Sequence, residues 1–281
     1  MPLTPTDEIV QQAAEDAVGV GAFNVVQLEH AQAIVAGAEA AERPVILQIS
    51  ENTARYHGGL EPVALATLAT ARAARVPVAV HLDHAESVDL VREAVELGFT
   101  SVMFDAAKLP YEQNVAATRE ITAYCHARGV FVEAELGEVG GKDGAHAPGV
   151  RTDPAEARAF VAATGVDALA VAVGSSHTML TRDAVLDFAL ITRLRDAVSA
   201  PLVLHGSSGV SDIDLAEAVR AGMTKVNIST HLNKTFTQAA RAYLDTHAEV
   251  ADPRKYLGPA RDAVAVEVAR LLGVLTGGQL L

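Results

Sequence analysis

Three histidines stand at or just beyond the ends of short apolar runs. The runs read VPVAVHLDH, ALAVAVGSSH and PLVLHG, and they carry His84, His177 and His205. Such runs are typical of parallel strands that are buried on both faces. In a barrel of parallel strands the carboxyl ends surround one mouth, so the three imidazoles are expected to converge there. A catalytic zinc takes three protein ligands and keeps one open position, although three imidazoles also suit cobalt and other divalent ions.

Further polar residues stand at the ends of the other apolar runs. They are Asn24, Ser50, Asp83, Asp105, Glu135 and Asn227. A buried strand is a costly place for charge unless the charge is paired or binds a metal, so the pattern indicates a functional mouth. Glu133 and Glu135 share one face of their strand, and Glu135 is expected to lie nearer the mouth. Each residue alone has a simpler reading, such as an ion pair between Asp83 and His84 that holds a loop.

The last two strand ends carry a separate signal. HGSSG, from His205 to Gly209, and NIST, from Asn227 to Thr230, offer hydroxyls, small residues and backbone N–H groups. Barrel enzymes often build a phosphate site from these two loops. The alternative is that these are polar turn residues before helices.

A long segment without hydrophobic periodicity, GEVGGKDGAHAPGVRTD, runs from residue 137 to 153. Its length and glycine content favour a lid that closes over the mouth and excludes water. Asp143 is the acid in this segment that is best suited to chemistry, although such an acid is often simply solvated.

The elements that must position these residues are eight β-type runs that alternate with amphipathic stretches. The runs begin near residues 21, 44, 76, 100, 131, 168, 201 and 225. Several intervening stretches open on Ser or Asp and close on Gly, as helix ends prefer. This order predicts a single (β/α)8 barrel domain over residues 1–281, with its active site at the carboxyl ends of the strands. A doubly wound sheet would carry a Gly-rich turn after its first strand, and AFNVVQLEH has none. The chain after Asn233 reads as helices with a break near DPRKYLGP.

Composition limits the partners and the compartment. The net charge of −13 argues against nucleic acid and anionic membranes. The N-terminus lacks the basic region of a signal peptide, and no apolar run approaches the roughly 18 residues of a membrane span, so a soluble protein is expected. The lone cysteine, Cys125, excludes an internal disulfide and fits a reducing cytoplasm. Cys125 is interpreted as a buried helix residue and not as a nucleophile.

Six dispersed motifs resemble the class II, metal-dependent ketose-bisphosphate aldolases, which include fructose- and tagatose-bisphosphate aldolases. They are HLDHAES, MFDAAKLPYEQNV, VEAELGEVGG, AVGSSH, LVLHGSSG and KVNIST, and the likeness extends from AFNVVQLEHAQAI to DPRKYLGPARDA. The resemblance implies a zinc-dependent lyase of carbohydrate metabolism. It also implies a homodimer or homotetramer, a second metal position and a monovalent cation.

The resemblance also assigns roles to residues. It makes His84, His177 and His205 the zinc ligands, and it places Asp105 and Glu135 beside an alternative metal position. Asp83 would handle the proton of the C4 hydroxyl, and Asp143 would remove the proton of dihydroxyacetone phosphate (DHAP). The substrate would contact Asn24, Ser50, Thr178, Gly206, Ser207, Ser208, Asn227, Ile228, Ser229 and Thr230, and Arg254 would bind the distal phosphate.

The implied chemistry agrees with the residues. Cleavage of a carbon–carbon bond leaves a carbanion, and zinc bound to the carbonyl and hydroxyl oxygens would stabilise the enediolate as a Lewis acid. The other route, a Schiff base, needs a lysine at the mouth. Lys225 is expected to begin its strand, at the opposite end, and Lys142 lies in the long loop.

Three departures from the family pattern concern the DHAP pocket. Thr178 stands where the family has a glycine after the second zinc histidine, Asp143 replaces a glutamate, and Asp105 is followed by Ala106 and Ala107 instead of Gly-Ser. They leave open an aldolase with a changed donor or acceptor, and a non-catalytic barrel that binds metal or sugar phosphate. A metal-dependent hydrolase is a third alternative. The sequence does not indicate the configuration of the sugar at C4.

Overall fold

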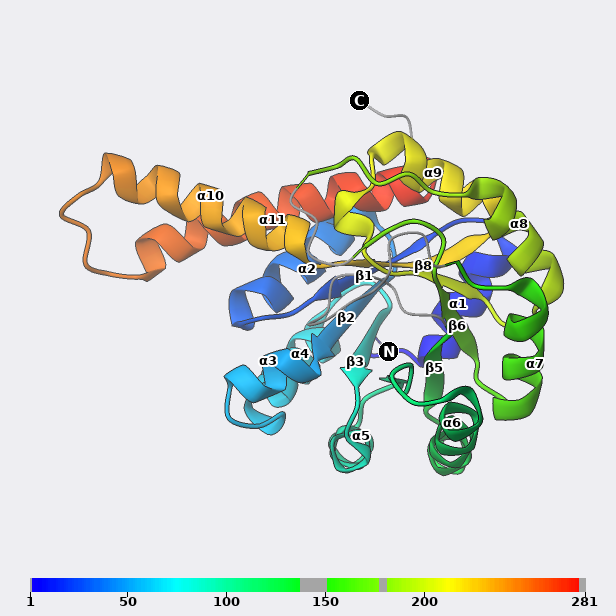
Figure 1. The fold of residues 1–281 in the computed structure, drawn as a ribbon. Coiled ribbons are helices and arrows are strands. Elements are labelled where there is room, and N and C mark those ends of the chain that lie inside the picture. The colour runs from blue at the N-terminus through cyan, green and yellow to red at the C-terminus, as the bar shows by residue number, and fades with distance from the viewer. Residues whose placement is uncertain (1, 137–150, 177–180, 278–281) are drawn as a thin grey trace.

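The computed structural model describes residues 2–136, 151–176 and 181–277. Within them, eight parallel strands pair in chain order and the last pairs with the first, so the barrel is closed (Figure 1). The strands are β1 Val20–Asn24, β2 Val45–Ser50, β3 Val78–Ala85, β4 Ser101–Phe104, β5 Phe131–Leu136, β6 Ala168–Val171, β7 Leu202–Leu204 and β8 Met223–Ile228. The (β/α)8 barrel expected from the sequence is confirmed.

Helices surround the barrel and connect the strands. They are α1 Thr6–Glu15, α2 Leu28–Ala41, α3 Glu51–Tyr56, α4 Glu61–Ala73, α5 Val88–Leu97, α6 Tyr111–His126, α7 Pro154–Thr164, α8 Phe188–Ala197, α9 Asp212–Ala221, α10 Thr230–Thr246 and α11 Arg254–Leu275. None of these helices is long and apolar enough to cross a membrane. Cys125 is buried in α6, and its burial raises the pKa of the thiol to about 11, which makes it a poor nucleophile.

The helix ends follow the signals in the sequence. The side chains of Ser87, Asp153 and Ser211 accept hydrogen bonds from backbone N–H groups in the first turns of α5, α7 and α9. Gly98 and Gly165 end α5 and α7 in the left-handed conformation that glycine adopts at low cost. These local caps fix where each helix meets the next strand, and so they fix where the strand ends lie.

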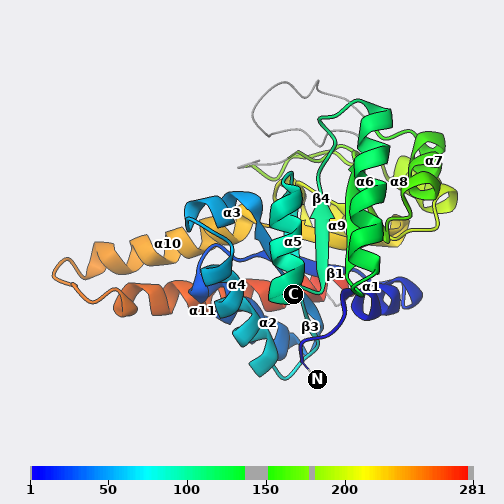
Figure 2. The same ribbon diagram turned by 90° about the horizontal axis from the view of Figure 1, so that it is seen from below.

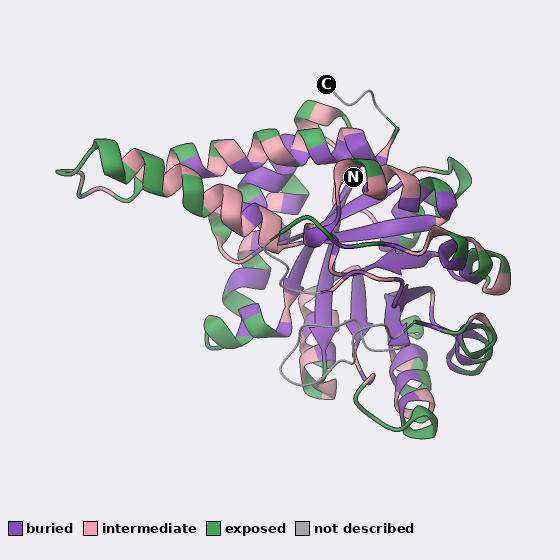
Figure 3. Cartoon of the chain, turned by 45° about the horizontal axis from the view of Figure 1, so that its top comes forward, coloured by how far each residue is buried: buried purple, intermediate pink, exposed green. Residues whose placement is uncertain are grey.

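The barrel interior is apolar at its amino end and polar below its mouth. Ile9, Val10 and Ala13 of α1 pack into the amino end against Ala22, Ile46 and other apolar interior side chains. Above them lies a fully buried polar layer composed of Gln48, His81, Ser101, Glu133 and Lys225. The register pairs Gln48 with His81 and His81 with Ser101, so these three residues lie at one level. Figure 3 shows the strands as the most buried part of the chain.

Helices α10 and α11 form an arm that extends beyond the barrel (Figures 1 and 2). The two helices pack side by side, and the carboxyl half of α11 covers the barrel through buried residues such as Val268 and Leu272. The predicted break between the helices is present, but it lies earlier in the chain than expected, between Thr246 and Arg254. It ends at Pro253, and α11 continues through Pro259.

Candidate active site

A cavity of about 190 Å³ opens at the carboxyl ends of the strands. It is lined by Asn24, Gln48, Ser50, Asn52, Asp83, His84, Gly206, Ser207, Ser208, Asn227, Ser229 and Thr230. All but two of these residues are site residues expected from the sequence. The two that sequence reasoning missed are Gln48, hidden in the middle of β2, and Asn52, in the first turn of α3.

His84 occupies an irregular point of β3. Its φ of +50° lies in the left-handed region that residues with a side chain rarely adopt. The pairing of β3 with β4 shifts register between Leu82 and Ala85, around this residue. The Nδ1 atom of His84 lies 2.9 Å from Oδ2 of Asp105, which directly follows β4. The carboxylate orients the ring, and Nε2 on the other side of the ring lies 3.9 Å from Oδ1 of Asp83.

Glu51, a third residue that sequence reasoning missed, holds the turn after His84. Its Oε2 accepts hydrogen bonds from the backbone N–H groups of Glu86 at 2.7 Å and Ser87 at 3.3 Å, and its Oε1 pairs with Arg55. Only 8% of Glu51 is exposed. The signal in the sequence was an acid directly after the strand-end residue Ser50, in the first turn of a helix.

His205 follows β7 and is held by two carboxylates. Its Nδ1 lies 2.8 Å from Oε2 of Glu135, and its Nε2 lies 2.9 Å from Oε1 of Glu133. Burial alone would lower the pKa of His205, but the two carboxylates outweigh it and raise that pKa to about 9. Glu133 is the interior partner that the strand periodicity predicted, and Glu135 lies nearer the mouth.

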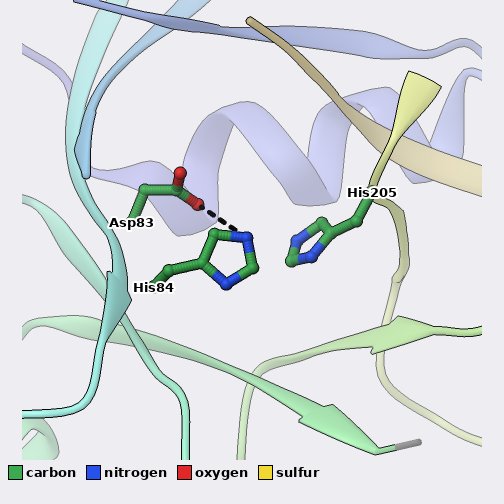
Figure 4. A group of neighbouring side chains, drawn as sticks. All are labelled: Asp83, His84 and His205. Atoms are coloured by element: carbon green, nitrogen blue, oxygen red, sulfur yellow. Dashed lines mark ion pairs between the residues drawn. The ribbon is translucent and has the colours of Figure 1, made fainter. Parts of the chain in front are cut away.

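Asp83, His84 and His205 converge from two strands that are distant in the sequence (Figure 4). One potential ligand atom from each lies within 4.8 Å of the others, and the two imidazole centroids are 4.7 Å apart. All three side chains are buried. Two imidazoles and a carboxylate at this spacing match the ligands of a catalytic divalent cation, so the residues fit such an ion. His177, the third expected ligand, lies outside the described residues.

Asp83 accepts hydrogen bonds from two side-chain amides. Nδ2 of Asn24 donates to its Oδ2 at 3.2 Å, and Nδ2 of Asn227 donates to its Oδ1 at 3.4 Å. Burial would raise the pKa of Asp83, but electrostatic attraction from the neighbouring His84, His205 and Lys225 outweighs it and lowers that pKa to about 2. The group is therefore ionised at neutral pH, the form that a proton acceptor needs.

Two loops on the β7–β8 side of the cavity offer groups for an anion. Gly206 has a φ of +66°, and a Cβ there would lie 2.5–2.8 Å from the backbone of Ser176. The chain therefore needs glycine at this turn. Ser207 donates its hydroxyl proton to the carbonyl of Asn227, which joins the two loops. Ser229 and Thr230 stand at the N-terminus of α10, where backbone N–H groups and the helix dipole favour an anion.

The remaining expected residues are placed as follows. Ser50 lines the cavity and also caps α3 by accepting from the backbone N–H of Thr53. Ile228 is buried in the outer core, so only its backbone is available to a ligand. Arg254 begins α11 at the far end of the arm, pairs with Asp252, and does not line the cavity of its own chain. Asp143 and Thr178 lie outside the described residues.

The expectation that Lys225 lies at the wrong end of its strand is wrong. β8 begins two residues earlier, at Met223, and the Lys225 side chain is fully buried in the barrel interior. Its Nζ donates to Oε2 of Glu133 at 2.7 Å and to Oδ1 of Asn227 at 2.8 Å. Because the ammonium group is paired with a carboxylate below the cavity, it does not reach a substrate carbonyl there.

Comparisons with known proteins agree with this geometry. The family model of class II fructose-bisphosphate aldolases matches residues 4–278. The fructose-bisphosphate aldolase of Geobacillus stearothermophilus is 43% identical over 272 residues, covering 95% of each chain, and that of Staphylococcus aureus is 41% identical over 268 residues, covering 94% of each chain. The crystal structure of the YdjI aldolase from Escherichia coli K12 superposes with a TM-score of 0.84 at 33% identity, covering 99% of this chain and 100% of that chain. With its barrel, its paired histidines and these relatives, the chain belongs to the class II fructose-bisphosphate aldolase family and is a lyase.

Proposed function

We propose that this aldolase is zinc-dependent and reversibly cleaves fructose- or tagatose-1,6-bisphosphate to DHAP and glyceraldehyde 3-phosphate. The observation that carries the proposal is the position of Asp83. Its carboxylate lies beside the paired histidines His84 and His205 and shares one cavity with the phosphate-binding groups at Gly206 and Thr230. A proton acceptor, a metal-binding pair and an anion site are the three parts that retro-aldol cleavage of a sugar phosphate requires.

The DHAP half of the substrate is proposed to bind at the β7 and β8 ends of the cavity. The backbone from Gly206 to Ser208, together with Ser229 and Thr230, would hold its phosphate. This placement directs the carbonyl and the adjacent hydroxyl toward His84 and His205. Zinc at these histidines would supply a Lewis acid for the carbonyl oxygen.

Asp83 would then take the proton of the C4 hydroxyl. As the C4 oxygen forms the aldehyde, the C3–C4 bond breaks and its electron pair stays on C3 of the DHAP half. An acid must protonate C3 to complete the reaction, and we propose Asp143 for this step. Asp83 suits the first step because its two acceptor oxygens are held by Asn24 and Asn227, which fixes the direction in which it accepts a proton.

A second metal position is proposed at Asp105 and Glu135. Each of these carboxylates contacts the Nδ1 atom of one paired histidine, at 2.9 Å for His84 and 2.8 Å for His205. A carboxylate that contacts the ring can instead face an ion at the mouth after a small rotation. A monovalent cation near the substrate phosphate belongs to the same proposal.

Substrate choice is proposed to depend on the β1 and β2 side of the cavity. Asn24, Ser50 and Asn52 line it there, and β1 pairs directly with β8, which leads into one of the phosphate loops. These side chains offer both donors and acceptors near the position of the C4 hydroxyl, where fructose and tagatose differ. Thr178 is the residue whose departure from the family pattern would change the donor.

We propose a homodimer or homotetramer in the cytoplasm, with one domain over residues 1–281. The arm supports an assembly, because α10 and α11 extend beyond the barrel and carry exposed apolar side chains such as Leu244 and Val266. If Arg254 binds the distal phosphate, it reaches the cavity of a second copy and not its own. The acidic net charge and the lone cysteine support a small-molecule substrate and a reducing compartment.

Hydrogen exchange into DHAP tests the proposal without a choice of aldehyde. In D2O, the zinc-loaded protein is expected to remove one proton from the hydroxymethyl carbon of DHAP, and the chelated protein is not. Proton NMR follows the loss of the signal. Absence of exchange in protein that is shown to bind zinc would contradict DHAP as the donor.

A further inference from the structure

A buried lysine lies under the active-site cavity and has no part in the steps above. Lys225 is fully buried in the barrel interior, at the level of Glu133. Its ammonium group donates to Oε2 of Glu133 at 2.7 Å and to Oδ1 of Asn227 at 2.8 Å. An ammonium group only donates hydrogen bonds, so it fixes which atoms of these two partners act as acceptors.

The first branch of this network leads to His205. Glu133 uses Oε2 for Lys225 and Oε1 for Nε2 of His205, at 2.9 Å. A carboxylate accepts only, so Nε2 must carry a proton. The same rule applies to Nδ1, which lies 2.8 Å from Oε2 of Glu135, so without a metal the ring carries a proton on both nitrogens. Glu135 lies nearer the mouth than Glu133, so Nδ1 is the nitrogen that would give up its proton to a metal, while Nε2 keeps its proton toward Glu133.

The second branch leads to Asp83. Because Oδ1 of Asn227 accepts from Lys225, the amide cannot turn over, and its Nδ2 must donate to Oδ1 of Asp83 at 3.4 Å. On the other side of Asp83, Nε2 of Gln48 donates to Oδ1 of Asn24 at 2.7 Å. The amide of Asn24 is therefore oriented with its Nδ2 toward Asp83. Asp83 therefore faces two donors whose orientation is set by neighbours.

We propose that Lys225 is a positioning residue that sets the hydrogen-bond direction on both sides of the active site. Through Glu133 it holds a proton of His205 on Nε2, so that Nδ1, on the side of Glu135 and the mouth, is the nitrogen that would bind the metal. Through Asn227 it presents an amide donor to Asp83. The first branch needs only a metal site, whereas the second rests on the proposed aldolase function.

A purely structural role is the alternative, in which the ion pair of Lys225 and Glu133 only fills the barrel interior. Such a pair would affect the stability of the barrel, but it would not affect metal affinity in protein that remains folded. It would also not change one chemical step more than another. The experiment therefore measures metal affinity and the ratio of two reaction rates, with the fold checked by circular dichroism.

The test uses variants of the full chain. Lys225→Met keeps the length of the side chain and removes the donor. The double variant Lys225→Met/Glu133→Gln avoids an unpaired buried carboxylate. If the lysine variants do not fold, Glu133→Gln alone tests the branch that leads to His205. Lys255→Met is the matched control, because Lys255 is exposed on the arm. Asn227→Asp keeps an acceptor for Lys225 but removes the donor to Asp83.

Zinc affinity, measured by competition with a chromogenic chelator, tests the first branch. We expect the folded Lys225→Met and Glu133→Gln proteins to bind zinc roughly 10- to 100-fold more weakly, as for lost partners of metal-bound histidines. The two losses should be non-additive in the double variant, because both act on His205. Affinities of the folded variants equal to those of wild type and Lys255→Met would overturn the first branch.

The ratio of bisphosphate cleavage to DHAP exchange, at saturating zinc, tests the second branch. Cleavage needs Asp83 and exchange does not, so Lys225→Met and Asn227→Asp should lower cleavage by about tenfold or more relative to exchange. An unchanged ratio would overturn this branch. If wild type itself neither exchanges nor cleaves, the proposed function fails, and the zinc measurements still decide the first branch.

Discussion

Asp83 has two roles open to it at the residue scale. Its carboxylate is within 4.8 Å of ligand atoms on His84 and His205, which would suit a metal ligand. Its two oxygens also accept from Asn24 and Asn227, which would suit a proton acceptor that is held apart from the metal. The two roles differ in what happens to metal affinity when the charge is removed.

Asp83→Asn is expected to lower bisphosphate cleavage by about 100- to 10,000-fold, the usual contribution of a general base. Zinc affinity and DHAP exchange should stay near their wild-type values, because His84 and His205 are intact. Steady-state cleavage, the exchange assay and chelator competition measure the three quantities. A large fall in zinc affinity would instead identify Asp83 as a ligand.

Most residues of the cavity could be predicted because parallel strands end at one mouth. Any polar side chain at the end of such a strand, for example Asn24 or His205, is brought there by the fold alone. Gln48 was missed because it lies two residues before its strand end. Glu51 was missed because its partners are backbone N–H groups of the next βα loop, which the sequence does not mark.

At the element scale, the loop after β7 depends on one backbone conformation. Gly206→Ala is expected to destabilise the fold by about 1–3 kcal/mol, because the new Cβ meets the backbone of Ser176 at a positive φ. The displaced loop should also raise the KM for the bisphosphate. Urea unfolding and steady-state kinetics measure the two effects.

Gly273→Ala is the matched control for Gly206→Ala. Gly273 lies in α11 and a Cβ there meets no atom within 4 Å, so this variant should gain up to about 1 kcal/mol of helix stability. Its kinetics should be those of wild type. Equal stability of the two variants would mean that the turn at Gly206 relaxes without cost.

The contact between α2 and α10 is expected to weaken in acid. His30 of α2 stacks on Phe236 of α10 with ring centroids 4.9 Å apart. Burial lowers the pKa of His30 from 6.5 to about 4, so the unfolded chain binds the proton first as the pH falls. The neutral ring contributes about 3 kcal/mol above pH 6.5, and this contribution is lost as the pH falls toward 4.

His30→Leu tests the effect on stability. Free energies of unfolding between pH 7 and pH 4 should fall less steeply in His30→Leu than in wild type, because the leucine does not titrate. His126→Gln serves as the control, since His126 lies at the surface, where it pairs with Asp167. Identical slopes in wild type and His30→Leu would rule out His30 as the source.

The elements themselves were predictable where caps and breakers bound them, and less so where a strand follows a turn. β8 begins at Met223 instead of Lys225, because the segment after Gly222 reads equally well as turn or strand. The sequence nevertheless implied which face of β8 carries the Lys225 side chain. Lys225 and Asn227 are two residues apart and share one face, so an Asn227 at the mouth places Lys225 in the interior.

At the scale of the whole molecule, the arm is the feature that the sequence did not predict. Helical periodicity indicated two helices after Asn233, but not that they leave the barrel surface. The local periodicity of a helix shows which of its faces is apolar, but not which other element that face packs against. The consequence is that Arg254, at the start of α11, lies far from the cavity of its own chain.

A mixed assembly tests whether two copies share each active site. In a dimer of one Asp83→Asn chain and one Arg254→Ala chain, sharing puts both defects in one site and leaves the other intact. With equal co-expression, about half of the dimers are mixed and each of these has one intact site of two. Cleavage at limiting substrate should therefore rise toward about a quarter of the wild-type value, although each variant alone has low activity. Sedimentation shows the assembly, and the coupled cleavage assay measures its activity. Activity equal to the mean of the two pure variants would show that Arg254 does not complete the cavity of a partner.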